Sequence, residues 1–306
     1  MKIFIVLFLS TLLGVIADEG ESILLCLEGS GYNLWNEALK IIQLKELCQI
    51  SVGLTAIPIR QRRGPIFFGS DGAISAFPFF VAIECYHFTT SGGSIISPKY
   101  VVTAAHIFDI IKDKDYFRVR SGSDERGRGG EEHELESYEK HPEYISDDGA
   151  GGCVNDISLI RIEGTFVYNK VQRPIPIFKA GEVAEPGAKA IVIGFGYTED
   201  GLPQHLKMTT LPLFDTNMCN ETWFNRDGYP IPNKTICAGG GKDRRDSCDG
   251  DSGGALVVGG KLAGILSFGY SRRTQDNRVE CGFEGVPSIY TEVAQFQSWI
   301  DDRIHS

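Results

Sequence analysis

The feature that most limits the fold is the texture of the chain from Ile66 onward, where short apolar runs alternate with turn residues. Such runs occupy residues 79–83, 93–96, 100–104, 156–162, 190–193, 255–258 and 262–268. Their length and regular interruption are typical of an all-β sandwich or a pair of barrels rather than of βαβ units. The final segment differs, because its apolar residues share one face of a predicted helix: Val293, Phe296, Trp299, Ile300 and Ile304.

The first residues of the chain predict a signal peptide. Lys2 precedes an almost wholly apolar run, residues 3–16, that ends at the small residue Ala17. This run is shorter than the roughly 20 residues that span a bilayer, and a buried N-terminal helix is the less favoured alternative. We therefore expect residues 1–17 to be removed and the protein to be secreted, with no membrane partner.

Residues 18–65 predict a separate pro-segment. Residues 33–47 carry apolar side chains at close to helical spacing, which indicates one amphipathic helix. The segment ends in Arg60-Gln61-Arg62-Arg63 followed by Gly64-Pro65, a charged boundary typical of a linker that a convertase cleaves. The alternative is a solvated charge cluster without a role. Residues 66–306 then form the main domain.

Charge argues against a nucleic-acid partner. The 30 Lys and Arg residues stand against 40 Asp and Glu residues, which gives a net charge of −10. Nucleic-acid-binding domains present basic faces, so a chain this acidic is not expected to bind DNA or RNA.

Secretion also decides how the cysteines are interpreted. The chain has eight, at positions 26, 48, 85, 153, 219, 237, 248 and 281, and an even number in an oxidising compartment predicts disulfides. No C-x-x-C pair is present and no His lies near a close cysteine pair, so we expect no zinc site. We also expect no other metal site and no cofactor. Two sequons predict glycosylation at Asn220 and Asn233.

Three segments carry the chemistry. Ser252 lies between glycines in Asp246-Ser247-Cys248-Asp249-Gly250-Asp251-Ser252-Gly253-Gly254, a turn that exposes a hydroxyl and lets amide groups converge nearby. His106 follows one apolar run and Asp156 begins another. A serine needs a neighbouring base to act as a nucleophile, and a carboxylate orients that base. Either His106 or Asp156 alone would be an ordinary structural residue, but together they predict nucleophilic catalysis.

These segments resemble a known family. Val102-Thr103-Ala104-Ala105-His106, Asn155-Asp156-Ile157-Ser158-Leu159-Ile160 and Gly250-Asp251-Ser252-Gly253-Gly254 are similar to the three signatures of trypsin-like, chymotrypsin-fold serine proteases. The likeness runs from about Ile66 to Ile300. It implies two six-stranded antiparallel β-barrels, with the active site between them and a helix at the C-terminus. The N-terminal segment more weakly resembles those of secreted nematode proteases.

The resemblance implies a role for each residue of the active site. Ser252 is the nucleophile, His106 the general base and then acid, and Asp156 the orienting carboxylate. The backbone N–H groups of Gly250 and Ser252 form the oxyanion hole, and Ser267 supports the aspartate.

The resemblance also implies a substrate pocket made by Asp246, Ser247, Ser267, Gly269 and Ser288. Aspartate at the position of Asp246 implies cleavage after arginine or lysine, because a buried carboxylate is costly unless a cation neutralises it. Ser288 replaces a glycine of trypsins, and its side chain narrows the predicted slot.

Two disulfides follow from the resemblance, Cys219–Cys237 and Cys248–Cys281. The family's bridge beside the histidine is absent, since Ser91 and Ile107 occupy both of its positions. Cys26, Cys48, Cys85 and Cys153 are left with three pairings. A bond from the pro-segment to Cys85 or to Cys153 would keep the segment attached after cleavage.

Activation in this family buries a new N-terminal ammonium beside the aspartate that matches Asp251. The spacing places that N-terminus at Ile66, whereas the last basic residue is Arg63. We expect a convertase cut after Arg63 and then trimming of Gly64-Pro65; the alternative is that Gly64 itself becomes the mature N-terminus.

The sequence thus predicts a secreted, monomeric serine endopeptidase zymogen that cleaves after Arg or Lys through an acyl-enzyme. Its expected partners are protein or peptide substrates, the activating convertase and protease inhibitors. The alternative function is a catalytically silent homologue that acts as an extracellular binding protein. An esterase or lipase is not favoured, because its serine precedes the aspartate and histidine in the chain.

Overall fold

The computed structural model describes residues 69–146, 152–228, 230–276 and 278–305, and the backbone of residues 13–18 and 21–26. The expected helix at residues 33–47, the processing site and Ile66 lie outside the described residues. Within the described part of the chain, no helix has the length and apolar character needed to span a membrane.

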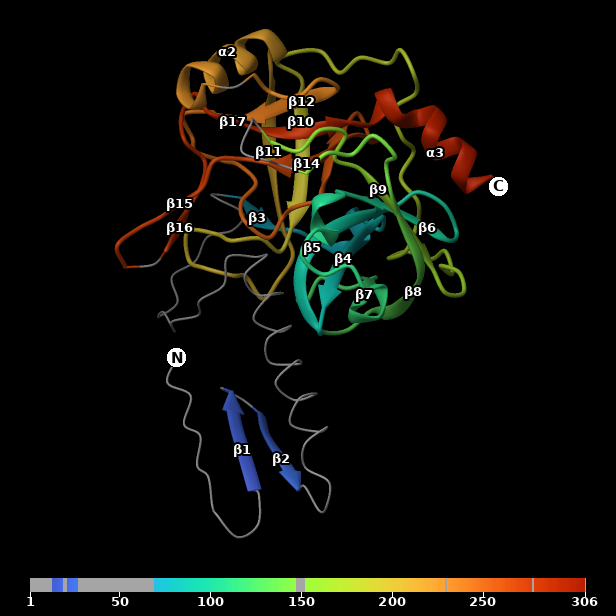
Figure 1. Ribbon diagram of the computed structural model, residues 1–306. Helices are drawn as coiled ribbons and strands as arrows, with labels where there is room; N and C mark the ends of the chain where they lie inside the picture. The colour runs from blue at the N-terminus through green and yellow to red at the C-terminus, as the bar shows by residue number, and fades with distance from the viewer. Residues whose placement is uncertain are drawn as a thin grey trace.

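Residues 80–162 build a first closed barrel of six antiparallel strands (Figure 1). In barrel order these are β4 (Phe80–Cys85), β5 (Phe88–Ile95), β6 (Tyr100–Thr103), β9 (Ser158–Ile162), β8 (Glu131–Lys140) and β7 (Phe117–Ser121). Side chains of alternate residues point inward because successive residues of a strand face opposite sides. The barrel is filled mainly by Val81, Ile83, Ile95, Val101, Val119, Leu135 and Ile160.

The second barrel follows the same plan. Its strands are β10 (Lys189–Gly194), β13 (Ala255–Val258), β14 (Lys261–Phe268), β17 (Pro287–Glu292), β12 (Thr235–Gly239) and β11 (Lys207–Phe214), and pairing of β10 with β11 closes it. The two-residue strand β3 (Ser70–Asp71) adds to β11. The predicted all-β fold of two six-stranded antiparallel barrels is confirmed.

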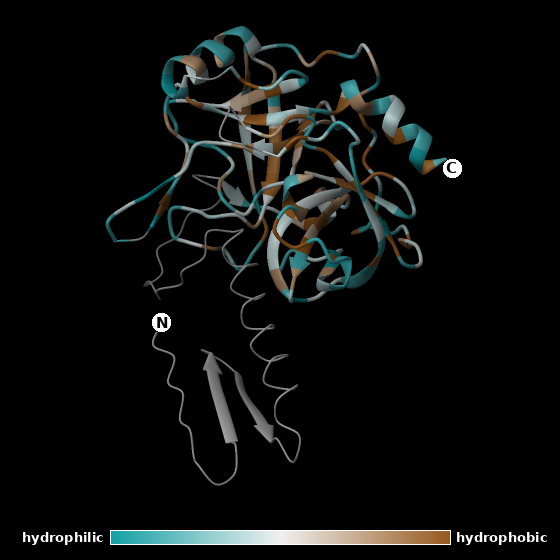
Figure 2. Ribbon diagram, in the orientation of Figure 1, coloured by the Kyte–Doolittle hydropathy of each residue, from teal (hydrophilic) through white to brown (hydrophobic). Residues whose placement is uncertain are grey.

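The barrels pack through a shared apolar core. It joins Phe80 and Val102 of the first barrel to Ile193 and Ile265 of the second. Figure 2 shows residues coloured as hydrophobic on strands of both barrels. Burial of this contiguous apolar surface fixes one barrel against the other, which a site shared between them requires.

The predicted C-terminal helix is present but begins differently from the expectation. Residues Val293–Phe296 form a 3₁₀ turn, η4, and the α-helix α3 runs only from Gln297 to Ile304. Val293, Phe296 and Ile300 enter the core between the barrels, as their spacing predicted. A tight 3₁₀ turn at a helix N-terminus is common, and it accounts for the shorter α-helix.

The remaining elements are short. The helix α2 (Thr216–Asp227) is capped by Asp215, which accepts a hydrogen bond from Met218 N at 3.0 Å, and ends at Gly228 in the left-handed region. Three further 3₁₀ turns are η1 (Ile74–Ala76), η2 (His106–Phe108) and η3 (Lys114–Tyr116). Two hairpins pair β1 (Leu13–Asp18) with β2 (Glu21–Cys26) and β15 (Arg272–Arg273) with β16 (Val279–Glu280).

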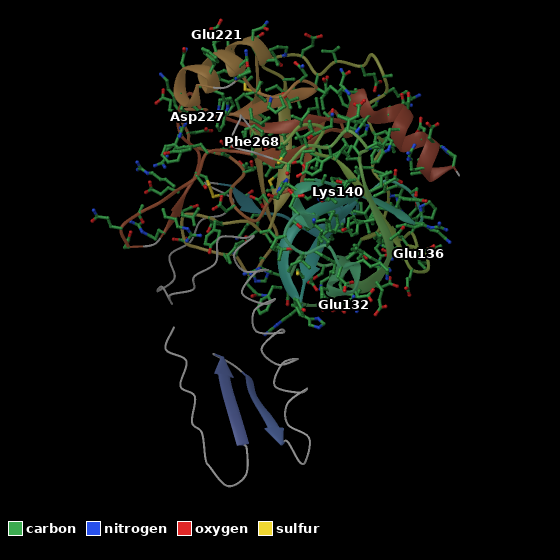
Figure 3. All side chains as sticks on the ribbon, in the orientation of Figure 1. Glu132, Glu136, Lys140, Glu221, Asp227 and Phe268 are labelled. Carbon is green, nitrogen blue, oxygen red and sulfur yellow. A yellow bond between two sulfur atoms is a disulfide. The ribbon has the colours of Figure 1, made fainter. Side chains whose placement is uncertain are left out.

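Much of the acidity lies on the outside of the first barrel. Along β8, Glu132 and Glu136 are exposed while His133 and Leu135 are buried (Figure 3). Arg120 pairs with Glu132 and also with the buried Glu84, whose Oε1 accepts from Arg120 Nε at 2.7 Å. The buried carboxylate of Glu84 is therefore neutralised.

Two disulfides are formed between described residues, Cys219–Cys237, which ties α2 to β12, and Cys248–Cys281. Cys85 is disulfide-bonded as well, and its partner is not among the residues whose side chains the structure describes. Each cross-link reduces the conformational freedom of the unfolded chain and so favours the folded state.

Candidate active site

Strand pairing brings the predicted base and carboxylate together. In β6 and β9, Thr103 lies opposite Ser158. His106 follows shortly after Thr103 in the chain, and Asp156 comes just before Ser158. Their side chains meet, with His106 Nδ1 2.7 Å from Asp156 Oδ2.

Asp156 is held by several donors at once. Its Oδ1 accepts from the backbone N–H groups of Ala105 at 2.7 Å and His106 at 2.9 Å, and its Oδ2 accepts from Ser267 Oγ at 2.6 Å. Burial raises the pKa of Asp156, but the charge and hydrogen bonds of His106 and Ser267 outweigh it, so the pKa lies below its usual value. The group is thus a fixed anion.

The same pair alters His106. Burial lowers the pKa of His106, but the charge of Asp156 and its hydrogen bond raise it by more, so the net pKa lies above its usual value. An imidazole whose Nδ1–H donates to Asp156 leaves Nε2 as its acceptor, which is the tautomer that a general base needs.

Ser252 lies on a turn that is hydrogen-bonded to both barrels. Gly250 and Gly253 have φ of 93° and 75°, in the left-handed region that glycine tolerates. Gly253 N donates to Leu266 O at 2.8 Å, and Ser252 O accepts from Gly92 N of the first barrel at 2.8 Å. Ser252 and His106 line the same cavity of about 260 Å³.

The predicted oxyanion donors are available. Among the described residues, the backbone N–H groups of Gly250 and Ser252 have no recorded acceptor, whereas those of Asp251 and Gly253 donate to Cys248 O and Leu266 O. Two amide groups left unpaired beside a serine hydroxyl suit the stabilisation of a developing oxyanion.

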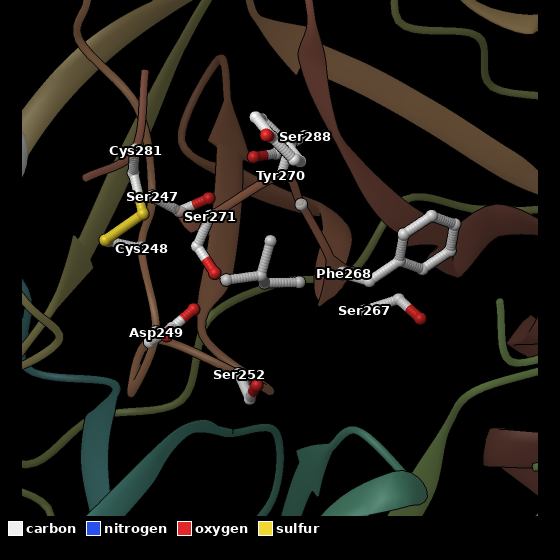
Figure 4. Close-up of a pocket in the computed structure, with 12 residues that line it drawn as sticks. Ser247, Cys248, Asp249, Ser252, Ser267, Phe268, Tyr270, Ser271, Cys281 and Ser288 are labelled. Atoms are coloured by element: carbon white, nitrogen blue, oxygen red, sulfur yellow. A yellow bond between two sulfur atoms is a disulfide. The ribbon is translucent and has the colours of Figure 1, made fainter. Parts of the chain in front are cut away.

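A second cavity, of about 180 Å³, begins at Ser252 and extends into the second barrel (Figure 4). Four of the five residues predicted for the substrate pocket line it: Ser247, Ser267, Gly269 and Ser288. The fifth, Asp246, is not among the described lining residues.

Asp246 is hydrogen-bonded to Ser288, one of the residues that line this cavity. Ser288 Oγ donates to Asp246 Oδ1 at 2.8 Å, and Ser247 N donates to the same oxygen at 2.9 Å. A Cβ added to Gly269 would lie 2.6 Å from Ser288 Oγ, so the pocket is narrow at this level. Burial raises the pKa of Asp246 to about 7, with the hydrogen bond from Ser288 opposing the rise.

Comparison with known proteins identifies the family to which the chain belongs. The family model described as "Trypsin" matches residues 66–300. The chain belongs to the trypsin family. It is 34% identical over 244 residues to trypsin epsilon of Drosophila erecta, an alignment that covers 79% of this chain and 88% of the relative.

Other relatives agree. A trypsin of Phaedon cochleariae is 33% identical, covering 77% of this chain and 86% of the relative. Trypsin alpha of Drosophila melanogaster is 31% identical over 274 residues, covering 88% of this chain and 99% of the relative. The chain is therefore a trypsin-like member of the serine protease family, as its motifs indicated.

In this trypsin-family fold, Asp251 is buried in the turn that carries Ser252. Its carboxylate accepts from Gly196 N at 2.7 Å and from Cys248 N at 3.0 Å. Burial raises the pKa of Asp251 to about 7. A Cβ on Gly196 would lie 2.4 Å from the Asp251 carboxyl carbon, so glycine is required there. Ile66, its predicted partner, lies outside the described residues.

The sequence did not predict two neighbours of the active site. The Sγ atom of Cys153, one ring nitrogen of His106 and one carboxylate oxygen of Asp156 all lie within 4.8 Å of one another. Gly152 packs against β14 so closely that a Cβ would lie 2.4 Å from the Phe268 ring. The only sequence signal was that both residues lie a few positions before Asp156, and spacing alone does not give the direction of a side chain.

Proposed function

We propose that this chain is the zymogen of a secreted serine endopeptidase that hydrolyses peptide bonds after arginine or lysine. The observation that carries the proposal is that His106, hydrogen-bonded to Asp156 at 2.7 Å, lines one cavity with Ser252. Nucleophile, base and orienting carboxylate are the three groups that acyl transfer requires.

In the proposed reaction, Ser252 Oγ attacks the scissile carbonyl carbon and its proton passes to His106. The carbonyl oxygen becomes an oxyanion that accepts hydrogen bonds from the N–H groups of Gly250 and Ser252. When the C–N bond breaks, the leaving amine takes the proton from His106 and the acyl group stays on Ser252. Water then repeats the sequence, releasing the acid and restoring Ser252.

Selection of a basic side chain rests on Asp246. A carboxylate that is costly to ionise when alone becomes favourable when a guanidinium or ammonium group enters beside it. The Ser288 hydroxyl donates a hydrogen bond to Asp246 Oδ1, so it lies next to the carboxylate that the substrate's cation would neutralise. Arginine offers several donors in one plane, which suits the two oxygens of a carboxylate better than the single ammonium of lysine does.

Activation is proposed to need two cuts, one by a convertase after Arg63 and one that removes Gly64-Pro65. The new ammonium of Ile66 would then neutralise Asp251, whose buried carboxylate has two amide donors but no recorded cationic partner among the described residues. Purified protein that starts at Gly64 should be at least tenfold less active than protein that starts at Ile66. Equal activity of the two forms would remove the trimming step.

Secretion and glycosylation complete the proposal. Of the two sequons, Asn233 lies exposed in a turn, whereas Asn220 lies on α2 and its Oδ1 accepts from Ile231 N at 2.9 Å. We expect the glycan at Asn233, because its side chain is free to meet the transferase. Protein inhibitors and protein substrates are the expected partners of the monomer.

Labelling with a fluorophosphonate probe tests the proposed function against the silent-homologue alternative. The processed protein should be modified at Ser252, since the probe's phosphorus is attacked only by an activated hydroxyl. Ser252→Ala should stay unlabelled, and Ser271→Ala, at the pocket rim, should label like the wild type. A folded, processed wild-type protein that stays unlabelled would indicate a binding protein.

A further inference from the structure

Cys153 lies beside His106 and Asp156, and the proposed reaction gives it no role. One ligand atom of each of these three side chains lies within 4.8 Å of the other two. In the part of the chain that the structure describes, this is the one group of three His, Cys, Asp or Glu side chains with its ligand atoms so close together. Thiolate, imidazole and carboxylate are the side-chain groups that bind Zn²⁺ in proteins.

The backbone on both sides of Cys153 is fixed by tertiary contacts. Before it, Gly152 has φ of 96° and packs so closely against β14 that an added Cβ would lie 2.4 Å from the Phe268 ring. After it, Val154 pairs with Ile145 through two backbone hydrogen bonds, of 2.9 and 3.0 Å. The sulfur is therefore held near its neighbours before any ion binds, which reduces the entropic cost of forming a metal site.

The distances suit a zinc ion after a small movement. Zinc bonds are about 2.3 Å long to sulfur and about 2.0–2.2 Å long to nitrogen and oxygen, so two ligands of a tetrahedral ion lie roughly 3.5 Å apart. The three atoms would therefore have to approach one another by about an ångström. Small rotations of the side chains about their χ angles give movements of this size.

An ion can reach this group from solvent, and its charge is balanced there. The Asp156 side chain is fully buried, but the His106 side chain is 24% exposed and Cys153 is partly exposed. One carboxylate and one thiolate together neutralise a divalent cation, and the imidazole binds as a neutral ligand. Lys140, whose charge acts on His106, is itself paired with Asp109 at 2.5 Å.

Tyr144 also contacts the sulfur, but only weakly. Its Oη donates to Asp109 Oδ2 at 2.6 Å and lies 3.7 Å from Cys153 Sγ. A hydroxyl has one proton, and the shorter contact to a carboxylate takes it. Metal binding at the sulfur therefore breaks no strong hydrogen bond to Tyr144.

We propose that Cys153, His106 and Asp156 form an inhibitory site at which Zn²⁺ reversibly inhibits the enzyme. The inference rests on the proposed function and adds its regulation. An ion on a ring nitrogen of His106 removes either the lone pair that accepts the Ser252 proton or the Nδ1–H that donates to Asp156, and either loss blocks acyl transfer. The proposal departs from the sequence-based expectation of no metal site, which rested on the spacing of ligands along the chain.

Zinc titration of the processed enzyme, with a blocked arginine ester as substrate, tests the inhibition. Zn²⁺ should inhibit the wild type, and a chelator should restore the full rate. Cys153→Ser should raise the zinc concentration for half-maximal inhibition at least about tenfold, because even loss of a group that only orients a ligand costs about 10–100-fold in affinity. His205→Gln, which removes an exposed histidine outside this group, should be inhibited like the wild type.

Binding is measured apart from activity in Ser252→Ala, which lacks the nucleophile. Calorimetric titration of this variant with Zn²⁺ should show a site that is lost when Cys153→Ser is added. Zinc should also slow the alkylation of Cys153 by iodoacetamide, followed by mass spectrometry, because the metal holds the sulfur that attacks the reagent.

A wild type that turns over the ester at the same rate with and without zinc would overturn the inference and leave the proposed function intact. Equal inhibition of the wild type and Cys153→Ser would do the same, as would a disulfide at Cys153 in the processed protein. If the folded, processed wild type fails to turn over the ester while Ser252→Ala still binds zinc through Cys153, the proposed function and the inhibitory role fail and only the metal site stands.

Discussion

Ser288 stands where the family resemblance implies a glycine, and its contact with Asp246 makes the consequence testable. Removing the side chain opens the space beside Gly269, where Ser288 Oγ now lies. Ser288→Gly should raise kcat/KM for arginine substrates severalfold, and Ser288→Ala, which keeps Cβ, should give an intermediate value. Unchanged or lower kcat/KM for Ser288→Gly would show that the hydroxyl does not restrict the slot.

The pKa of His106 predicts the pH dependence of activity. Only neutral imidazole accepts the Ser252 proton, so activity is lost as pH falls through the pKa of His106. Because Asp156 raises this pKa, the acidic limb of kcat/KM should lie above the usual histidine value of about 6.5. Asp156→Asn should move the limb to lower pH and reduce kcat by about 10⁴-fold. An unmoved limb in this variant would contradict the pairing.

At the residue scale, the sequence predicted which residue types meet but not the contacts that tune them. His106, Asp156 and Ser252 lie in motifs whose spacing to neighbouring strands fixes their positions. The family resemblance predicts Ser288 in the pocket of Asp246 but not its hydrogen bond to the carboxylate. Cys153 lies in no such motif, and its proximity to His106 depends on side-chain direction in three dimensions, which one-dimensional spacing does not carry.

At the scale of elements, apolar runs identified the strands that are buried on most sides. They did not reveal β8, because its sequence Glu131–Lys140 is mainly polar and only its inward positions, such as Leu135, are buried. When only every second residue of a strand is buried and the residues between are charged, the average hydropathy of the strand is low and the strand is hard to detect. The barrel needs β8 all the same, since it joins β7 to β9.

The packing of the segment before Asp156 against β14 gives a prediction at this scale. Gly152→Ala places a methyl group in the Phe268 ring at a φ of 96°, and should lower the free energy of unfolding by about 3 kcal/mol. Gly164→Ala is the matched control, since its φ is 75° but nothing lies within 4 Å of the added Cβ. It should cost about 1 kcal/mol. Equal losses in urea unfolding would mean that the Phe268 contact is unimportant.

For the whole molecule, Asp251 links stability to pH in the unprocessed chain. Burial raises the pKa of Asp251 in the folded state to about 7, from an ordinary value of 3.8, so the folded state binds more protons between these values. Stability is therefore fully present below pH 4 and is lost as pH rises toward 7, by about 4 kcal/mol for this group. Asp246 contributes in the same direction.

Asp251→Asn removes one of these groups. In urea unfolding of the unprocessed chain with Ser252→Ala as background, this variant should lose less stability between pH 4.5 and pH 8 than its parent, by about 4 kcal/mol at most. Asp302→Asn, an exposed aspartate near the C-terminus, should follow the parent. If the free energy of unfolding changes with pH equally in Asp251→Asn and in its parent, the Asp251 carboxylate has a cationic partner before processing.

A cleavage profile of the processed protein on an unbiased peptide library measures directly whether Ser252 cleaves peptides after basic residues. With Ser252→Ala as the blank, nearly all cleavage should follow arginine or lysine, with arginine favoured. Cleavage that follows phenylalanine, leucine or alanine would refute the pocket assignment, and cleavage that persists in Ser252→Ala would refute the nucleophile.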